Sequence, residues 1–385
     1  MKVVVVGAGI VGVSIAVELA KRGAEVTIAE RDSPGSGTSS TSFAWVNSNN
    51  KEPSSYYELN LAGLEAHAKL AATGASWLQT TGHIEFATQL PHVNDLRERT
   101  HRLRERGYEV ESISADRVRE LASDVIIPDD CHSAVFYPRE SHCFPSLYID
   151  NMLDQAALLG VSLRRNGEVR ELAPVGRGAR VTLSDGSSMF ADYVISAAGR
   201  WTNQIAELAG VPPVMAEYER PGDVTVGYLA TTNPLPVTLD RIITSPRLNI
   251  RPAGDGRLLL QALDLDVQAD PFDVPATDSV TAQEFISRLN YVVKNTDRAV
   301  ISSLKVGQRA MPSDGHSVIG ASAMAPWLYL VATHSGVTLA PMLGTAVAGE
   351  IFGEPEPLFV DFRPDRFFGQ GELPKPHVPR RPGEQ

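Results

Sequence analysis

Residues 1–30 of the chain read MKVVVVGAGIVGVSIAVELAKRGAEVTIAE, and this stretch decides the fold. The β-branched run Val3–Val6 predicts a strand, residues 7–12 form a glycine-rich turn, and the residues after the turn have the pattern of an amphipathic helix. A second strand, Val26–Ala29, ends in Glu30. Strand, glycine turn, helix, strand and acid in this order predict a complete βαβ dinucleotide-binding unit.

Each glycine of the turn has a physical role in such a unit. Gly7 permits the tight turn, Gly9 lets backbone N–H groups approach a pyrophosphate, and Gly12 lets helix and strand pack closely. The N-terminus of the helix offers unpaired donors and the positive end of its dipole to phosphates. Glu30 is placed to accept hydrogen bonds from both ribose hydroxyls and would repel a 2′-phosphate, which favours FAD or NAD over NADP. Glycines that serve packing alone are the other interpretation, but packing does not require the acid.

The composition is that of an ordinary globular protein. The chain has 385 residues, 43% of them hydrophobic and 21% charged, and a formal net charge of −11. This charge argues against nucleic acid or an anionic membrane as a partner, and no apolar run approaches the length of a membrane span. Cys131 and Cys143 are the only cysteines, so we expect a cytoplasmic protein. No spacing of histidines or cysteines predicts a metal site, and the oligomeric state stays open.

Nucleotide-binding patterns return in the middle of the chain and near its end, and strand-rich segments with proline and glycine turns fill the gaps. We therefore expect an α/β fold in which a Rossmann-like domain is interleaved with an antiparallel β-sheet domain. The expected boundaries are 1–80, 145–213 and 305–368 for the first domain, 81–144 and 214–304 for the second, and 369–385 for a disordered tail.

Among the connecting segments, the pattern predicts helices over Tyr57–Leu78 and Leu96–Arg106. It also predicts a hairpin whose strands, 180–183 and 188–196, are joined at Asp185-Gly186.

Four pieces of sequence carry a resemblance to a known family. They are GAGIVG with Glu30, SGTSSTSFAWVN (36–47), VISAAGRW (194–201), and the C-terminal pair GQRAMPSDGHSVIG (307–320) and ATHSGVTLAPMLGTAVAGEIF (332–352). With them the chain resembles the FAD-dependent D-amino-acid oxidase superfamily, close to glycine oxidase and sarcosine oxidase in size, up to about Phe368. NAD dehydrogenases with one Rossmann unit lack the last two pieces.

The resemblance implies a glycine-oxidase-like fold, bound FAD and an enzyme that oxidises the C–N bond of an amino acid or carboxylate-bearing amine. In such a reaction hydride passes to flavin N5 and water hydrolyses the imine product. Oxygen, giving hydrogen peroxide, or another electron acceptor then takes up the electrons.

The resemblance also assigns residues to the FAD. In the family, the N–H groups that open the helix after Ser335 point at the flavin pyrimidine, where reduced flavin carries negative charge. Phe43 and Trp45 are either walls of the flavin or core aromatics. The expected FAD contacts are Gly7, Gly9, Ile10, Val11, Gly12, Glu30, Arg31, Ser39, Ser40, Ala44, Trp45, Val169, Ala198, Gly199, Trp201, Arg309, Ser335, Gly336, Val337 and Thr338.

Three residues are the candidates for substrate binding and catalysis: Arg309, Asn249 and Arg251. Arg309 resembles the family arginine that pairs with the substrate carboxylate, because a guanidinium fork fixes the plane of a carboxylate. The alternative is an arginine paired to an acid such as Asp314. Where glycine and D-amino-acid oxidases carry a carboxylate-gripping tyrosine, this chain reads LNIRP (248–252), so Asn249 or Arg251 takes that place. Arg251 either suits a second acidic group on the substrate or is solvated.

The chain departs from sarcosine oxidases in two further places. Residues 309–312 contain no cysteine to which a flavin could be attached, so we expect non-covalent FAD. Residues 258–261 read LLLQ and lack the lysine that promotes the reaction with oxygen, which leaves a dehydrogenase open.

Two other functions remain open. One is a flavin dehydrogenase of a 2-hydroxy acid, which needs a histidine base, and the candidates are His334, His316 and His142. The other is a catalytically silent FAD-binding protein.

Overall fold

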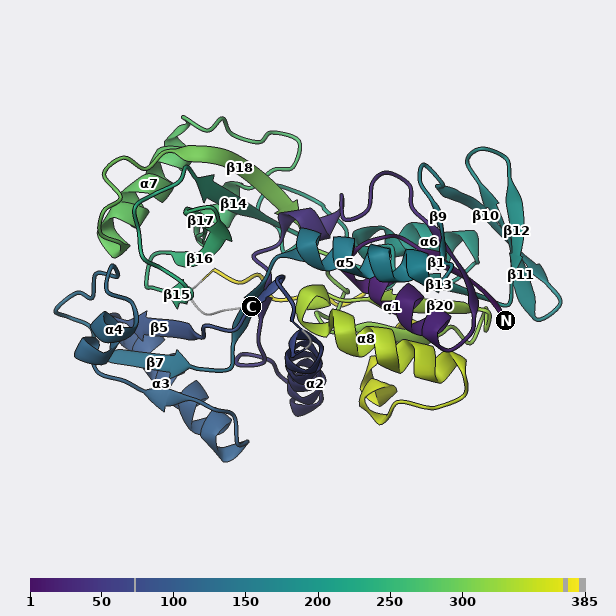
Figure 1. Ribbon diagram of the computed structural model, residues 1–385, viewed down its shortest axis with the longest axis horizontal. Helices are drawn as coiled ribbons and strands as arrows, with labels where there is room; N and C mark the ends of the chain where they lie inside the picture. The colour runs from purple at the N-terminus through teal and green to yellow at the C-terminus, as the bar shows by residue number, and fades with distance from the viewer. Residues whose placement is uncertain (73, 370–372, 381–385) are drawn as a thin grey trace.

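The computed structural model describes residues 1–72, 74–369 and 373–380. Within them the chain forms a mixed α/β fold whose strands make four sheets. The two larger sheets occupy opposite halves of the molecule, the six-stranded sheet on the right of Figure 1 and the eight-stranded sheet on the left. None of the helices in the described residues has the length and apolar character needed to cross a lipid bilayer.

The six-stranded sheet has the order β19-β20-β13-β1-β2-β9. Its strands are β1 (Lys2–Val6), β2 (Glu25–Ala29), β9 (Ser162–Arg164), β13 (Tyr193–Ser196), β19 (Val318–Ala321) and β20 (Leu328–Ala332). All neighbours run parallel except the edge strand β19, which is antiparallel to β20. The four valines of β1 are buried, Val3 and Val5 in the hydrophobic cluster on one face of the sheet and Val4 and Val6 in the cluster on the other face, as expected for a parallel strand covered on both faces.

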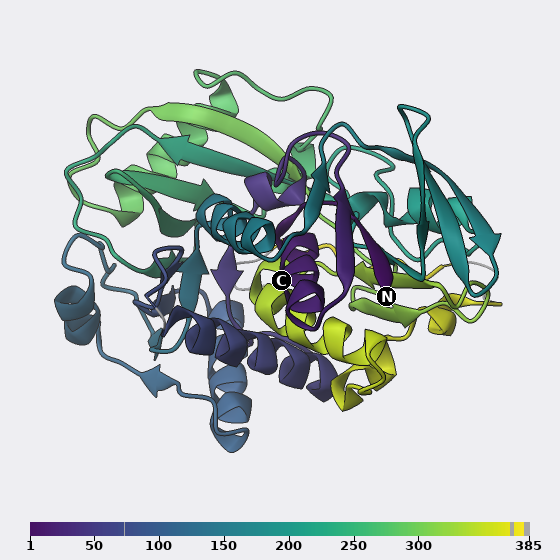
Figure 2. The same cartoon turned by 45° about the vertical axis from the view of Figure 1, so that its right-hand side comes forward.

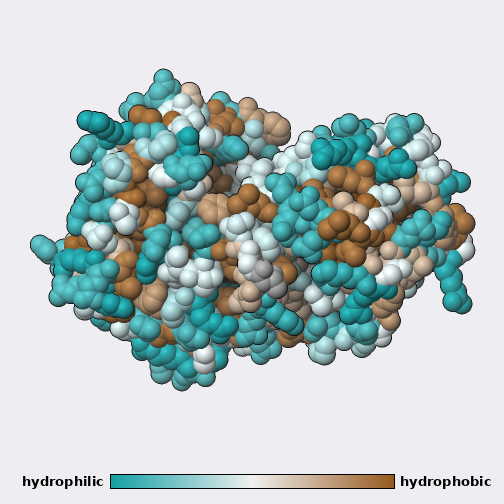
Figure 3. All heavy atoms as spheres, viewed as in Figure 1, coloured by the Kyte–Doolittle hydropathy of each residue, from teal (hydrophilic) through white to brown (hydrophobic). Residues whose placement is uncertain are grey.

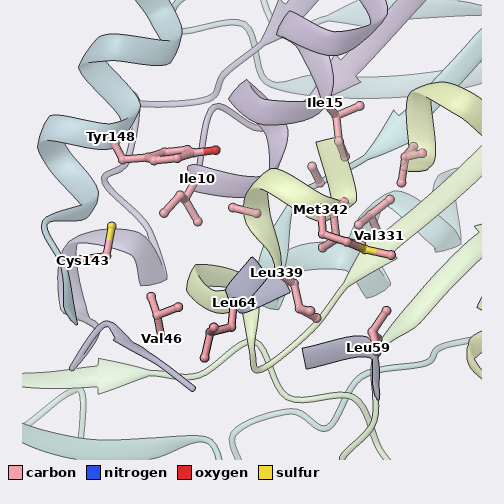
Figure 4. Packing of buried hydrophobic residues seen from close by; sticks show 14 of the residues in the cluster. Ile10, Ile15, Val46, Leu59, Leu64, Cys143, Tyr148, Val331, Leu339 and Met342 are labelled. Atoms are coloured by element: carbon pink, nitrogen blue, oxygen red, sulfur yellow. The ribbon is translucent and has the colours of Figure 1, made fainter. Parts of the chain in front are cut away.

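Helices cover this sheet and form the main core. They are α1 (Ile10–Lys21), α2 (Ser54–Ala71), α5 (Pro145–Leu158) and α8 (Gly336–Ile351). Figure 2 shows α1 between α5 and α8, with α2 alongside α8. In the close view of Figure 4, Ile10 and Ile15 of α1 lie opposite Leu339 and Met342 of α8. Burial of each such side chain contributes about 1.5–3 kcal/mol, so these contacts hold the start of α8 firmly.

The eight-stranded sheet has the order β18-β14-β17-β16-β15-β5-β7-β6. Its strands are β5 (His83–Ala87), β6 (Glu111–Ser112), β7 (Ser133–Tyr137), β14 (Val226–Thr232), β15 (Ile242–Thr244), β16 (Asn249–Gly254), β17 (Arg257–Gln261) and β18 (Ile301–Gln308). Its pairs are antiparallel except β15 with β5, which run parallel. The sheet is therefore mixed rather than wholly antiparallel, because two segments far apart in the sequence meet at this pair. Strand β18 also crosses residue 305, where we expected a domain boundary.

The remaining elements connect the two halves or cover the sheets. The helical ones are α3 (Leu90–Glu105), α4 (Ala115–Leu121), α6 (Thr202–Leu208), α7 (Val280–Val292), η1 (Thr38–Thr41), η2 (Gly199–Trp201), η3 (Leu265–Gln268), η4 (Pro357–Phe362) and η5 (Pro364–Phe367). The small sheets are β3 (Trp45–Val46), β8 (Ser141–Cys143) and β4 (Leu78–Gln79), and β10 (Val169–Val175), β11 (Gly178–Leu183) and β12 (Ser188–Ala191).

Three expected elements differ from the structure. Helix α2 ends at Ala71 and not near Leu78, and Gly74 has a φ of 100°, which no helical residue adopts. Helix α3 starts at Leu90 with a proline in its first turn, where the missing N–H costs nothing. The expected strand 188–196 is two strands, because β12 pairs with β11 while β13 pairs with β1 of the large sheet.

Of the expected disordered tail, 369–385, the structure describes residues 369 and 373–380, while 370–372 and 381–385 lie outside the described residues. The ammonium of Lys375 lies 3.0 Å from the carboxylate of Glu219, and Pro379 is buried. The guanidinium of Arg380 donates to a backbone carbonyl. Proline restricts the backbone before folding, so ordering this segment costs little conformational entropy.

Candidate active site

A cavity of about 350 Å³ lies at the edge of the six-stranded sheet where its parallel strands end. Residues directly after four of these strands line it: Gly7 after β1, Glu30 after β2, Ala197 after β13 and Thr333 after β20. Open α/β sheets bind ligands in the crevice outside the carboxyl ends of their strands. We call this space the sheet-edge cavity.

The glycine turn at this edge requires glycine for steric reasons. Gly7 has a φ of 103°, and a Cβ there would lie 2.7 Å from the carbonyl oxygen of Ala197. A Cβ at Gly12 would lie 2.0 Å from the carbonyl oxygen of Gly7. Gly9 lines the cavity, and a Cβ there would meet only the hydroxyl of Ser39, at 3.3 Å. Gly7 and Gly12 therefore allow the turn to fold, whereas Gly9 keeps the cavity wall flat.

The carboxylate of Glu30 is fixed by the backbone. Its Oε2 accepts from the N–H of Ala8 and its Oε1 from the N–H of Asp32, both at 2.8 Å. A carboxylate has about four acceptor positions, so each oxygen keeps one for a ligand. Because Glu30 lines the cavity, it is oriented to accept from two neighbouring hydroxyls, as a ribose presents.

A second cavity, of about 370 Å³, continues from the first; we call it the chamber. Thr38, Ser42, His334 and Val337 line both spaces, so the two form one connected site. The chamber walls come from β14, β16 and β17 of the eight-stranded sheet, from the start of α8, and from residues 376–379. Figure 3 shows the surface hollowed at its upper edge, between the two halves of the molecule.

The first turn of α8 lies where the two cavities meet. The N–H groups of Gly336, Val337 and Thr338 have no acceptor within the part of the chain that the structure describes. The carbonyl of Val337 accepts from His67 at 2.7 Å, which helps to fix this turn. Burial lowers the pKa of His67 to about 4, so a neutral imidazole makes this bond. Free donors at a helix N-terminus are suited to hold negative charge.

Arg309 follows β18 and lines the chamber. Its Nη2 lies 2.8 Å from Oδ2 of Asp266, and its Nη1 donates to the carbonyls of Val224 and Val226. Asp266 is buried, which raises the pKa of its carboxyl, and the charge of Arg309 opposes this rise. Arg309 has no acceptor for its Nε–H in the described residues, so three contacts orient the guanidinium, and the Nε–H and one Nη2–H stay available.

The acid considered as the alternative partner of Arg309 is engaged elsewhere. Asp314 pairs with Arg366, whose Nε lies 2.8 Å from its Oδ2. Arg309 is thus paired with an acid, but with Asp266.

Asn249 and Arg251 lie on the same face of β16 but have different surroundings. Asn249 lines the chamber and its amide lies 3.4 Å from Oε1 of Gln261. Arg251 lines neither cavity, donates to the carbonyl of Phe43 and lies over the ring of Phe144. It is 5% exposed, and burial lowers its pKa to about 10. Arg251 lies two residues beyond Asn249, about 7 Å further along the strand, and this takes it past the chamber. The structure therefore supports neither of its expected roles, which were to bind a second acidic group of the substrate or to be solvated.

Lys51 lines the chamber and was missed by the sequence analysis, because a lysine in the polar run after β3 matches no pattern. It is 7% exposed, and burial lowers its pKa to about 8, although the charge of Glu140 opposes this. Glu140 is fully buried and accepts hydrogen bonds from Trp45 at 2.8 Å and from Tyr108 at 2.9 Å. The polar cluster beneath the chamber therefore fixes Trp45 in the chamber wall.

The other expected FAD contacts divide between the two cavities. The chamber is lined by Ala44, Trp45, Arg309, Ser335, Val337 and Thr338. The sheet-edge cavity is lined by Gly7, Gly9, Ile10, Val11, Glu30, Arg31, Ser39, Val169, Ala198, Gly199, Trp201, Gly336 and Val337. Gly12 and Ser40 line neither: Gly12 packs behind the turn, and the exposed Ser40 donates to the carbonyl of Gly37.

Of the histidines considered as bases, His334 and His316 line the chamber and His142 lines neither cavity. Burial, with smaller contributions from the charges of Lys51 and Arg309, lowers the pKa of His334 to about 3.

A glycine turn at a parallel sheet edge, joined to a chamber beneath a second sheet, is typical of an oxidoreductase that holds a dinucleotide against its substrate. Comparison with known proteins agrees with this class. The model of the DAO family, described as FAD dependent oxidoreductase, matches residues 2–349. The chain therefore belongs to the DAO family of FAD-dependent oxidoreductases, and the resemblance inferred from its sequence is confirmed.

Curated relatives match nearly the whole length of the chain. The uncharacterized oxidoreductase YurR of Bacillus subtilis (strain 168) is 25% identical over 367 residues, which cover 91% of this chain and 95% of YurR. A glycine oxidase of Geobacillus kaustophilus (strain HTA426) is 23% identical over 357 residues, covering 90% and 91% of the two chains.

Solved structures share the fold. The crystal structure of glycine oxidase from Geobacillus kaustophilus has a TM-score of 0.81 at 22% identity and covers 95% of this chain and 99% of its own. That of L-proline dehydrogenase from P. horikoshii has a TM-score of 0.82 at 21% identity, covering 95% and 97%. The expected glycine-oxidase-like α/β fold is confirmed.

FAD is the cofactor of this family, and the residues present fit it. The flat wall at Gly9 matches a diphosphate, and the two open acceptor positions of Glu30 match a ribose. The N–H groups of Gly336–Thr338, which have no acceptor in the described residues, match a ring that carries negative charge when it is reduced.

Proposed function

We propose that this enzyme oxidises the C–N bond of an amino acid or a carboxylate-bearing amine bound in the chamber. The observation that carries the proposal is Arg309, a guanidinium oriented by Asp266 and two carbonyls on the chamber wall, with its Nε–H available. A preoriented guanidinium binds a carboxylate at low entropic cost and fixes its plane. The matched glycine oxidase and L-proline dehydrogenase are named for amino acids, which supports this substrate class.

In this reaction, bound FAD supplies a hydride acceptor at its N5. The contribution of the chain is alignment and exclusion of water. Arg309 holds the carboxylate, the wall that contains Trp45 and Asn249 encloses the rest of the substrate, and the N–H groups of Gly336–Thr338 favour negative charge near the start of α8. An amine that binds in its neutral form needs no side-chain base, and water hydrolyses the released imine.

The surroundings of His334 also favour amine oxidation over oxidation of a 2-hydroxy acid. Removal of a hydroxyl proton calls for a base whose pKa lies near the working pH. The low pKa of His334, about 3, makes it a poor acceptor of such a proton.

We further propose that the FAD is held without a covalent bond and that oxygen is its electron acceptor. Neither Cys131 nor Cys143 lines the sheet-edge cavity or the chamber. Denaturation of the yellow protein should therefore release all the flavin into the supernatant. Flavin that remains with the precipitated chain would contradict the first proposal.

Anaerobic flavin bleaching tests the substrate class. The purified FAD-loaded protein is mixed with glycine, sarcosine, both enantiomers of alanine and proline, iminodiacetate, and lactate as the hydroxy-acid control. We expect at least one amine to bleach the flavin absorbance while lactate does not, and air to restore the yellow colour. Bleaching by lactate alone, or by none of these compounds, would refute the proposed function.

A further inference from the structure

Residues near the end of the described chain line the chamber. Residues 373–380 read LPKPHVPR; we call them the strap. Pro376, His377 and Pro379 line the chamber together with residues of the eight-stranded sheet and of the start of α8, and Figure 1 shows the yellow end of the ribbon between the two halves of the molecule. The strap is therefore part of the chamber wall, although it belongs to neither sheet.

Contacts at both ends hold the strap in place. Leu373 packs against the hydrophobic cluster on one face of the six-stranded sheet. Lys375 pairs with both carboxylate oxygens of Glu219, at 3.0 and 3.1 Å, and Arg380 donates to the carbonyl of Gly222. Between these contacts, the Cβ of Pro376 lies 3.8 Å from the Cβ position of Gly315, another residue of the chamber wall.

The strap also contacts the structure that orients Arg309. Gly222, which accepts from Arg380, donates its own N–H to the carbonyl of Ala269, directly after η3, at 2.9 Å. It packs so closely on η3 that a Cβ there would lie 2.2 Å from a backbone carbonyl oxygen of this helix. Helix η3 carries Asp266, whose carboxyl has a pKa raised by burial, and the charge of Arg380 opposes this rise less strongly than that of Arg309 does. The strap is therefore linked through Gly222 and η3 to the acid that pairs with Arg309.

We propose that the strap is the outer wall of the substrate chamber and that His377 and Pro379 set the upper limit on substrate size. This inference rests on the proposed function only in taking the chamber as the place of the substrate. Three prolines within the strap limit its conformations, so it can act as a wall of defined position at low entropic cost. The part of a substrate that points away from Arg309 meets this wall.

Binding of unreactive carboxylates tests the size limit. Acetate, butyrate, hexanoate and octanoate are titrated into the FAD-loaded full-length protein, and each Kd is measured from the change in flavin absorbance. We expect His377→Ala/Pro379→Ala to bind the longest acids about tenfold or more tightly than wild type, since one methylene excluded from a pocket is worth roughly tenfold or more. Its Kd for acetate should stay close to that of wild type.

The matched control is His101→Ala, which removes an exposed histidine on α3 that pairs with Glu105 and lines neither cavity. An unchanged dependence on chain length in the double variant would overturn the strap proposal. The two proposals fail separately: if amines bleach the flavin but the length limit does not move, only the strap is refuted. If the limit moves but no amine bleaches the flavin, only the proposed function is refuted.

A disulfide tests the position of the strap without any ligand. The separation of 3.8 Å between the Cβ positions of residues 315 and 376 equals the usual Cβ–Cβ distance of a disulfide, about 3.8 Å. Gly315→Cys/Pro376→Cys should therefore lose two titratable thiols on mild oxidation and regain them with reductant. Gly315→Cys alone is the control for the strain of a φ of 82°. Thiols that fail to pair in the folded double variant would overturn the placement.

Discussion

The sheet-edge cavity and the chamber are joined, yet they are built in opposite ways. Backbone geometry forms the first: a glycine turn, strand ends and the N-termini of α1 and α8. Side chains form the second, and several of them carry buried charge, such as Lys51 and the pair of Arg309 with Asp266. A site formed by the backbone is disrupted by any substitution that alters the path of the chain. A site formed by side chains can be altered by substitutions that each remove a single contact.

The largest effect is expected from Gly12→Ala, which tests the sheet-edge cavity, the part of the site formed by the backbone. The added Cβ would lie 2.0 Å from a backbone oxygen of the turn, and neither α1 nor β1 has room to move. We expect a loss of stability above about 4 kcal/mol and a protein that retains no FAD. Thermal unfolding and the flavin-to-protein absorbance ratio measure both effects.

The control is Gly176→Ala, in a turn where a Cβ meets nothing within 4 Å and φ is 61°. This variant should lose only about 1–2 kcal/mol and keep its flavin. Equal behaviour of the two variants would show that the tight packing at Gly12 is not what maintains the cavity.

The sheet-edge cavity could be predicted from the sequence because the residues that form its turn lie close together in the sequence. Gly7, Gly12 and Glu30 lie within one βαβ unit, and each has a geometric requirement that a pattern of residue types expresses. The carboxyl ends of parallel strands must also meet at one edge, which brings 197 and 333 to the turn. The pattern did not reveal that Ser40 faces solvent, since neighbouring serines in a short helical turn look alike in sequence.

The second largest effect is expected from Arg309→Met, which tests the chamber, the part of the site formed by side chains. Removing the guanidinium leaves Asp266 buried without its cation, which should cost about 3–5 kcal/mol of stability. Carboxylate affinity should fall by about 2–5 kcal/mol at the same time. Unfolding and acetate titration of the FAD-loaded protein measure the two losses independently.

A second substitution separates these losses. Arg309→Met/Asp266→Asn removes both charges of this pair, so stability should return while carboxylate affinity does not. Arg241→Met is the matched control, because Arg241 is 13% exposed against 14% for Arg309, pairs with Asp240, and lies outside both cavities. Acetate that binds the double variant as it binds wild type would remove Arg309 from the substrate site.

The chamber could be predicted only in part, since its contacts join residues far apart in the sequence. Arg309 was predicted from the sequence and lines the chamber, but its partner Asp266 lies 43 positions away, and the acid considered as its alternative partner, Asp314, is paired elsewhere. Arg380 reaches Gly222 across 158 positions, which no local pattern expresses. Arg251 was assigned from the resemblance of residues 248–252 to the strand that carries a tyrosine in glycine and D-amino-acid oxidases, and this resemblance does not tell where along the strand the chamber ends.

A smaller effect, limited to alkaline pH, is expected at Lys51. Its pKa is about 8 in the folded protein and 10.5 in the unfolded chain. Between these values the unfolded state binds more protons, so stability rises with pH relative to Lys51→Met, by at most about 1.4 kcal/mol per pH unit. Acetate affinity should fall above pH 8 in wild type only, because the chamber loses a positive charge. Parallel pH profiles of wild type and variant, in unfolding and in titration, would contradict this.

The smallest effect is expected from His334→Asn, although His334 lines both cavities. Burial keeps its imidazole neutral above pH about 3, so it neither holds a substrate anion by charge nor takes up a proton near neutrality. We expect kcat/KM for the best amine to change by less than about tenfold, whereas loss of a general base costs about 10²–10⁴. The pH profile of kcat/KM should also keep its shape. A fall of kcat/KM by about 10²–10⁴, together with the loss of an acidic limb in the pH profile, would show that the chamber contains a base. It would favour oxidation of a hydroxy acid.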